Sequence, residues 1–232
     1  SLLTPALALT LSGMPDRLVS LIDVDNTLLD NDAAKAEIGR RLLDLLGDDG
    51  AAAFWSAYEA VRAELTVVDI PRSIHRALPP GTSLELRAEL ADLFMRFPFA
   101  DYIYPGALEA IAWLKWLGPV VILSDGDPVF QPNKINRAGL AEAVDGHVLV
   151  YTHKEEHLIE IAAAFPASRY LLVDDKPRVI ERVTARADEL GAPLQTVLVR
   201  QGKYAAEVGE GDFAGATWTC STIAEVRSVP IG

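Results

Sequence analysis

The stretch LVSLIDVDNTLLD, residues 18–30, joins a run of apolar residues to two carboxylates, Asp23 and Asp25. A short, nearly continuous apolar run is typical of a strand that is covered on both faces of a parallel sheet. The two carboxylates are separated by a single residue, so they repel each other and are costly to remove from water. A buried strand that ends in such a pair indicates a functional site at its carboxyl end.

Four further apolar runs follow along the chain, with helical patterns between them. The five expected strands are residues 17–23, 119–125, 146–152, 168–175 and 194–200. The helices expected between them cover residues 106–118, 154–165 and 177–191, and residues 216–229 are expected to add a strand and a short helix. Strands that alternate with helices predict a doubly wound α/β fold with a parallel sheet.

Residues 31–102 interrupt this alternation, because all of their patterned segments have helical spacing. This pattern predicts an all-helical insertion at residues 31–102 and an α/β core made of residues 1–30 and 103–232. An insertion directly after the first strand would hang over the carboxyl ends of the strands. Open α/β sheets bind their ligands at that edge.

The composition excludes several classes of partner. The net charge of −12 argues against nucleic acid and against anionic membrane surfaces, which attract basic proteins. No run approaches the length of a membrane span, and the first residues lack the basic region of a signal peptide. The single Cys220 fits a reducing compartment. We therefore expect a cytoplasmic protein that is a monomer or a homodimer.

Acidic and small polar residues also end two other expected strands. Ser124 and Asp125 end the second strand, and Asp174 and Asp175 end the fourth. The carboxyl ends of parallel strands meet at one edge, so these groups should gather with Asp23 around one crevice. Any one of the acids alone is better explained as a helix cap or a solvated turn residue. Their joint occurrence at three strand ends favours a site.

Clustered carboxylates need a cation or must take up protons. Oxygen ligands suit a hard ion such as Mg²⁺, and the absence of a His/Cys cluster in the sequence argues against zinc.

Four segments in this order resemble the motifs of the haloacid dehalogenase (HAD) superfamily of hydrolases. DVDNTL at residues 23–28 is similar to the first motif, and Ser124 in VILSD is similar to the second. Lys154, which opens a helix, resembles the basic third motif, and Asp174 and Asp175 in LLVDDKP resemble the acidic fourth. The helical insertion lies where this family carries a helical type-1 cap.

The resemblance implies a role for each residue. Asp23 would be a nucleophile that forms an aspartyl-phosphate, and Asp25 a general acid and base. Mg²⁺ would be held by the Asp23 carboxylate, the Asp25 backbone carbonyl and the two acids of the fourth motif. The residues that would bind the phosphate or order its loop are Ser124, Asp125, Lys154, Asn26 and Thr27.

Asp25 also separates branches of the family. The dehalogenase branch resembles this chain but has no Asp there, because a halide leaving group needs no proton. A carboxylic acid at this position suits an alkoxide leaving group, so the resemblance implies a phosphatase acting on a small phosphorylated metabolite. The alternatives are a phosphomutase on the same scaffold and a catalytically idle phosphate-binding protein.

Three other residues have both a functional and a purely structural interpretation. Lys134 is a rival for the role of Lys154, but the pattern favours a solvated helix residue. Trp55 and Tyr58 lie three residues apart and share a helical face, which favours packing inside the insertion.

Overall fold

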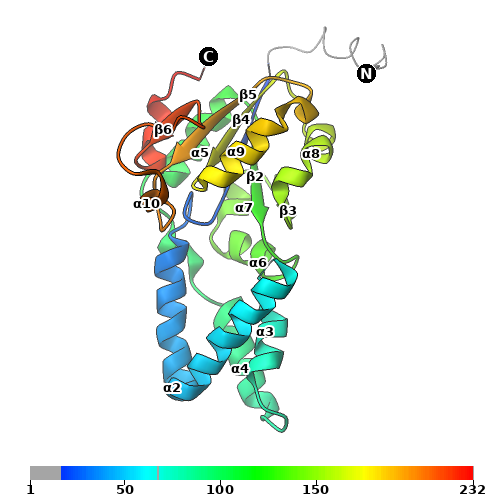
Figure 1. The fold of residues 1–232 in the computed structure, drawn as a ribbon, viewed down its shortest axis with the longest axis vertical. Helices are drawn as coiled ribbons and strands as arrows, with labels where there is room; N and C mark the ends of the chain where they lie inside the picture. The colour runs from blue at the N-terminus through cyan, green and yellow to red at the C-terminus, as the bar shows by residue number, and fades with distance from the viewer. Residues whose placement is uncertain (1–16, 67, 232) are drawn as a thin grey trace.

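The computed structural model describes residues 17–66 and 68–231 and contains one six-stranded parallel sheet (Figure 1). The spatial order of the strands is β3-β2-β1-β4-β5-β6, and every neighbouring pair is parallel. The strands are β1 (Leu18–Ile22), β2 (Val120–Asp125), β3 (Val148–Tyr151), β4 (Arg169–Asp174), β5 (Leu194–Val199) and β6 (Trp218–Cys220). The predicted doubly wound α/β fold is confirmed, including the sixth strand from the tail.

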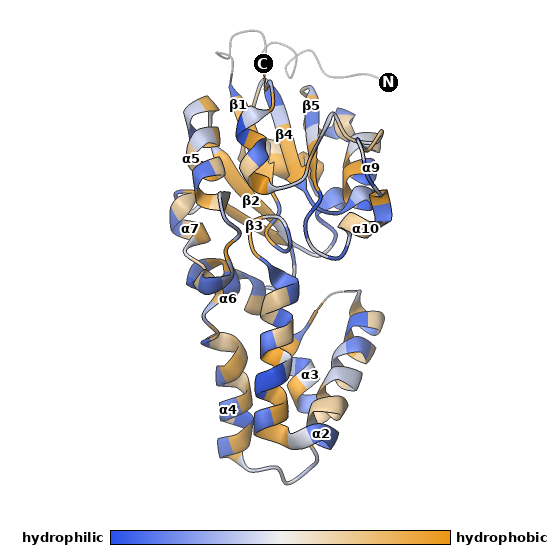
Figure 2. Cartoon of the chain, turned by 90° about the vertical axis from the view of Figure 1, so that its left-hand side faces the viewer, coloured by the Kyte–Doolittle hydropathy of each residue, from blue (hydrophilic) through white to orange (hydrophobic). Residues whose placement is uncertain are grey.

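Alternate strand residues face two separate apolar layers. In β1, Leu18 and Ile22 belong to one buried cluster, whereas Val19 and Leu21 belong to the other. The strands are strongly apolar along their length for this reason, as Figure 2 shows in the hydropathy colours. The first layer is closed by α5 (Ala107–Leu117), α6 (Phe130–Arg137), α7 (Leu140–Ala143) and η4 (Ile223–Ser228). The second is closed by α8 (Leu158–Ala164), α9 (Pro177–Ala185) and η3 (Ala187–Leu190).

Three of the helices that lie between β1 and β2 in the chain form a separate group beyond one edge of the sheet (Figure 1). They are α2 (Asn31–Leu65), α3 (Ile70–Ala77) and α4 (Leu84–Met95), and we call them the helical insertion. At Gly47, α2 is broken by a residue with φ of 70°, which glycine adopts without steric cost. The side chains of Asp30, Asp69 and Ser83 accept a backbone N–H bond at the start of the three helices.

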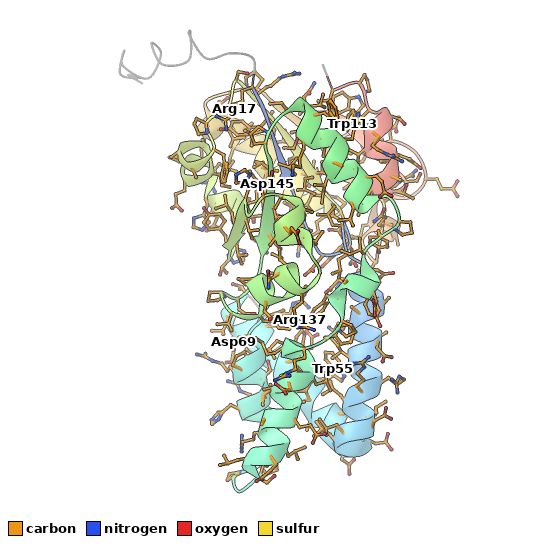
Figure 3. All side chains as sticks on the ribbon, turned by 180° about the vertical axis from the view of Figure 1, so that it is seen from behind. Arg17, Trp55, Asp69, Trp113, Arg137 and Asp145 are labelled. Atoms are coloured by element: carbon orange, nitrogen blue, oxygen red, sulfur yellow. The ribbon has the colours of Figure 1, made fainter. Side chains whose placement is uncertain are left out.

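The two connections between the insertion and the sheet run side by side. Tyr104 N donates to Leu28 O at 2.9 Å, and Asp30 N donates to Tyr102 O at 2.8 Å. Arg137, which lies at the junction (Figure 3), donates to the backbone oxygens of Arg96 and Phe97 just after α4. These bonds hold the insertion over the carboxyl ends of the strands.

The division into a core of residues 1–30 and 103–232 and a helical unit of residues 31–102 stays a prediction. Residues 1–16 lie outside the part of the chain that the structure describes. Within residues 17–66 and 68–231, none of the helices combines the length and the apolar character that a bilayer span requires.

Candidate active site

The ends of three adjacent strands bring the predicted acidic residues together. β1 lies between β2 and β4 in the sheet, with Ile22 opposite Ile122 on one side and Val173 on the other. Asp23 follows β1 directly, so it lies between the polar ends of both neighbours. Ser124 and Asp125 end β2, and Asp174 ends β4. The polar residues expected at these strand ends therefore lie at one edge of the sheet.

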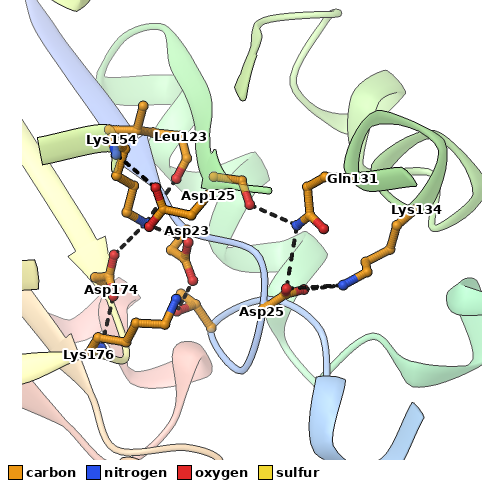
Figure 4. A network of polar contacts seen from close by, with 11 residues as sticks. Asp23, Asp25, Leu123, Asp125, Gln131, Lys134, Lys154, Asp174 and Lys176 are labelled. Atoms are coloured by element: carbon orange, nitrogen blue, oxygen red, sulfur yellow. Dashed lines mark hydrogen bonds and ion pairs between the residues drawn. The ribbon is translucent and has the colours of Figure 1, made fainter. Parts of the chain in front are cut away.

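Lys154 lies at the centre of this group and is fully buried. Its Nζ is 2.5 Å from Asp23 Oδ1 and 2.6 Å from Asp174 Oδ2, and it also donates to Leu123 O at 3.1 Å (Figure 4). Its backbone N–H donates to Asp125 Oδ1 at 2.7 Å. Burial alone would lower the pKa of Lys154, but the two carboxylates raise it above its usual value. Lys154 opens the short helix η2 (Lys154–Glu156), but the single helix expected over residues 154–165 is divided, because α8 starts anew at Leu158.

More carboxylates lie around Lys154 than its single positive charge can neutralise. Asp23, Asp174 and Asp175 each offer a carboxylate oxygen within 4.8 Å of the others, and all three are buried. Burial would raise the pKa of Asp23, but Lys154 and Lys176 hold it below its usual range. Burial and the nearby Asp174 and Asp23 raise the pKa of Asp175 to about 9.

The carboxylate of Asp175 is the observation that tests whether a metal ion fits. Neither of its oxygens has a hydrogen-bond partner among the described residues, although both are buried. Buried carboxylates are ordinarily paired or bound to a metal. Three converging carboxylates without histidine or cysteine are the donor set of a hard ion such as Mg²⁺. The residues present therefore fit the predicted ion.

Asp175→Asn should raise the thermal stability of the metal-free protein. In the wild type, folded Asp175 keeps a proton up to a pH of about 9, whereas the unfolded chain releases it near pH 4. The free energy of unfolding should therefore fall as the pH rises between these values, and the variant should lose this slope. We expect its Tm at pH 8 to be higher by roughly 2–12 °C, from a desolvation penalty of about 1–3 kcal/mol.

Thermal unfolding with a chelator and with Mg²⁺ tests this expectation. Mg²⁺ should raise the Tm of the wild type and have little effect on the variant, because the variant lacks one carboxylate ligand. A metal-free variant that is less stable than the wild type at pH 8 would contradict it.

Asp25 occupies a different part of the site from the acidic cluster (Figure 4). Lys134 Nζ lies 2.9 and 3.0 Å from the two oxygens of Asp25. Gln131 Nε2 donates to Ser124 Oγ at 2.8 Å and lies 3.5 Å from Asp25 Oδ2. The interpretation of Lys134 as a solvated residue was wrong, because only 4% of it is exposed. The helical spacing around Lys134 gives no local sign of this burial.

Lys176 is a site residue that sequence reasoning missed. It follows the acidic pair Asp174–Asp175 and lines the cavity described below. Burial would lower the pKa of Lys176, but the four carboxylates Asp23, Asp174, Asp175 and Asp25 raise it well above its usual value. The chain thus supplies a second cation next to the acidic cluster. Its position directly after the two acids in LLVDDKP could have indicated that it belongs to the site.

The loop after β1 is fixed by neighbouring segments. Asn26 has a left-handed φ of 63°, and its Oδ1 accepts from Asp32 N at 3.2 Å. Thr27 is buried, and its hydroxyl lies 3.5 Å from Asp23 Oδ2. Gly202, with φ of 63°, packs so closely on Asn26 that a Cβ there would lie 2.4 Å from Asn26 Cγ. The loop is therefore held in place from both sides.

A cavity of about 620 Å³ lies between these strand ends and the helical insertion. Of the predicted site residues, Asp25, Asn26 and Asp125 line it, whereas the acidic cluster, Ser124, Thr27 and Lys154 lie beneath its surface. Trp55 and Tyr58 also line it. Both rings also pack inside the insertion, against Phe54 and against each other, as the sequence indicated, so they contribute to the insertion core and to the cavity wall.

Comparison with known proteins identifies the family. No protein-family model matches the chain, and no curated protein matches it. A solved structure described as a haloacid dehalogenase-like hydrolase from Burkholderia xenovorans LB400 is 35% identical. The match covers 93% of this chain and 99% of that one, with a TM-score of 0.81. The chain belongs to the HAD superfamily of hydrolases.

More distant HAD structures share the fold. The HAD-hydrolase YfnB from Bacillus subtilis, bound to magnesium, is 17% identical, with a TM-score of 0.60 and coverage of 92% of this chain and 98% of that one. The L-2-haloacid dehalogenase from Xanthobacter autotrophicus is 16% identical, with a TM-score of 0.57 and the same coverage. At these identities the likeness concerns the HAD fold alone.

Proposed function

We propose that the protein is a Mg²⁺-dependent phosphohydrolase that acts on a small phosphorylated metabolite. One observation carries the proposal: the carboxylate of Asp25 lines the cavity two residues after the buried Asp23. A carboxylic acid at that place can supply a proton to an alkoxide leaving group. Displacement of a halide needs no such donor, so the arrangement supports phosphate ester chemistry over dehalogenation.

Two displacements at phosphorus would complete the reaction. In the first, an oxygen of Asp23 attacks the phosphorus, the bond to the ester oxygen breaks, and Asp25 gives its proton to the departing alcohol. In the second, Asp25 takes a proton from water, whose oxygen attacks the same phosphorus and releases inorganic phosphate and the Asp23 carboxylate. Asp25 thus returns to its protonated form, and all atoms balance.

The other residues of the site would support this chemistry. The carboxylates of Asp23, Asp174 and Asp175, with the Asp25 backbone carbonyl, would hold Mg²⁺. The ion would offset the repulsion between an anionic nucleophile and an anionic phosphate. Lys154 keeps Asp23 ionised and oriented through its 2.5 Å contact. Gln131 orients the Ser124 hydroxyl, which would contact phosphate oxygens together with Lys176.

Hydrolysis by the wild-type protein tests the proposal directly. A panel of phosphorylated metabolites and an aryl phosphate should release inorganic phosphate in the presence of Mg²⁺ and little after chelation. A panel of 2-haloacids should release no halide. Turnover of haloacids without turnover of any phosphate ester would overturn the proposal in favour of a dehalogenase.

Asp25→Asn should separate the two steps. An aryl leaving group needs little help from an acid, so the first step should survive and release one equivalent of phenol. The second step lacks its base, so steady-state turnover should fall by about 10²- to 10⁴-fold. Rapid-quench measurement of phenol and phosphate checks both amplitudes. Asp48→Asn, at an exposed position in α2, is the control and should turn over normally. Full steady-state activity in Asp25→Asn would contradict the role.

A cytoplasmic location is part of the same proposal. It is supported by the single cysteine, Cys220, which is buried and free.

A further inference from the structure

Four of the cations that line the cavity form no ion pair with the acidic cluster or with Asp25 among the described residues. Lys35 and Arg62 come from the helical insertion, and Arg178 and Lys203 come from the α/β part of the chain. We call these four residues the rim cations. All four line the cavity, although the chain as a whole carries a net charge of −12. A local positive group in an acidic protein indicates a place that attracts an anion.

The rim cations are not neutralised by the protein. Among the described residues, Glu59 is their acidic partner, at 3.6 Å from Lys35 and 3.3 Å from Arg62. Lys203 and Arg178 form no ion pair within the described chain and instead lie over the ring of Tyr204, at 5.1 and 5.9 Å. Burial lowers the pKa of Lys35, and Lys203 and Arg62 lower it further against the effect of Glu59. The cations therefore repel one another across the gap.

The loop that carries Lys203 is held rigidly against both parts of the molecule. Gln201 donates to Thr27 O at 3.2 Å and accepts from Ile223 N at 2.5 Å. Lys203 N donates to Asp32 Oδ2 at 2.8 Å, which ties the loop to the first turn of α2. The backbone of Lys203 is thus placed in advance, so no ordering of this loop is needed when the side chain binds a ligand.

The rim cations and the acidic end of the cavity share no ion-pair partner. Lys134 forms an ion pair with Asp25, and the carboxylates at the strand ends raise the pKa of Lys176. The acidic partner of the rim cations is Glu59 instead. Tyr58 lies within electrostatic reach of both ends: burial raises its pKa to about 12, and Arg62 and Asp25 act on it as well. The volume of 620 Å³ is that of a site for a metabolite rather than for phosphate alone.

We propose that the substrate carries a second anionic group, a carboxylate or a phosphate, which the rim cations bind while its reacting phosphoryl group lies at Asp23. This inference rests on the proposed phosphohydrolase function for the placement of the phosphoryl group. It predicts that doubly anionic esters are preferred over esters that end in a neutral group, because Lys35 and Lys203 meet the second charge.

Binding of non-hydrolysable phosphonates tests the inference without any need for turnover. Three alkyl phosphonates of equal chain length would be titrated into the Mg²⁺-loaded protein by calorimetry, ending in a carboxylate, a second phosphonate or a neutral amide. At least one of the two compounds that carry a second anionic group should bind about tenfold or more tightly than the amide. The tighter of the two identifies whether the second group is a carboxylate or a phosphate.

Variants of the rim cations test whether these residues cause the preference. Lys203→Gln and Lys35→Gln should each reduce the affinity ratio between the preferred compound and the amide by several fold. The control Lys115→Gln removes a cation on α5 that contacts Asp145, and it should keep the wild-type ratio. Because Lys203 is exposed, its variant should unfold at the wild-type temperature, which separates lost binding from lost folding.

Three results would overturn the inference: equal affinity for all three compounds, no binding of any of them, or a preference that both variants retain. The proposed function fails differently. Suppose that the protein prefers compounds with a second anionic group, in a manner that depends on Lys203, and yet hydrolyses no phosphate ester. That result would support the anion site at the rim cations and overturn the proposed hydrolase function.

Discussion

Asp23→Asn should abolish phosphate ester hydrolysis, with a loss of at least about 10⁴-fold in kcat. The amide has no negative charge, so it cannot attack phosphorus to form the covalent intermediate. Asparagine has nearly the same shape, and its amide can still contact Lys154, which lies 2.5 Å from the wild-type carboxylate. The loss should therefore appear in chemistry rather than in folding. Phosphate release by the purified variant with Mg²⁺ measures it.

Asp44→Asn is the matched control for this experiment. Asp44 is an exposed residue of α2 that pairs with Arg40 on the surface, so its replacement should leave turnover and Tm near those of the wild type. Wild-type turnover in Asp23→Asn, in a preparation free of wild-type protein, would exclude Asp23 as the nucleophile.

Lys154→Met should destabilise the protein more than any surface change. The wild-type ammonium is fully buried between Asp23 and Asp174, at 2.5 and 2.6 Å. Its removal leaves two buried carboxylates without their cation, which costs about 3–5 kcal/mol. For a chain of this size, the Tm of the metal-free protein should fall by roughly 6–20 °C. Thermal unfolding in a chelator at neutral pH measures the change.

Lys115→Met separates this effect from the loss of any lysine. Lys115 pairs with Asp145 at 2.8 Å on the surface, so its replacement should cost less than about 1 kcal/mol. Added Mg²⁺ should restore part of the lost Tm in Lys154→Met, since it supplies positive charge to the same acids. Equal Tm values for Lys154→Met and the wild type in chelator would refute the structural role of Lys154.

The sheet and its acidic edge could be predicted because they depend on local pattern and on a general rule of topology. Apolar runs fix the strands, and parallel strands bring their carboxyl ends to one edge. This is why Asp23, Ser124 and Asp174 were expected together before their contacts were known.

Lys134 and the rim cations could not be predicted in the same way. Lys134 has the sequence environment of an ordinary helix residue, and its burial results from α6 packing under the insertion. Lys35 and Lys203 are 168 positions apart in the printed sequence and meet only because the insertion folds back over the sheet. Such contacts depend on how the two parts pack, which short-range patterns do not encode.

In the proposed reaction, Asp23 carries the phosphoryl group during turnover. The most direct measurement is the mass of the peptide containing Asp23 after wild-type protein, Mg²⁺ and a hydrolysed phosphate ester are quenched in acid. A fraction of this peptide should gain one phosphoryl group, located on Asp23 and removed by hydroxylamine. In Asp25→Asn, where the second step is blocked, release of the alcohol without this adduct would contradict the role of Asp23 as the nucleophile. An adduct on another residue would also contradict it.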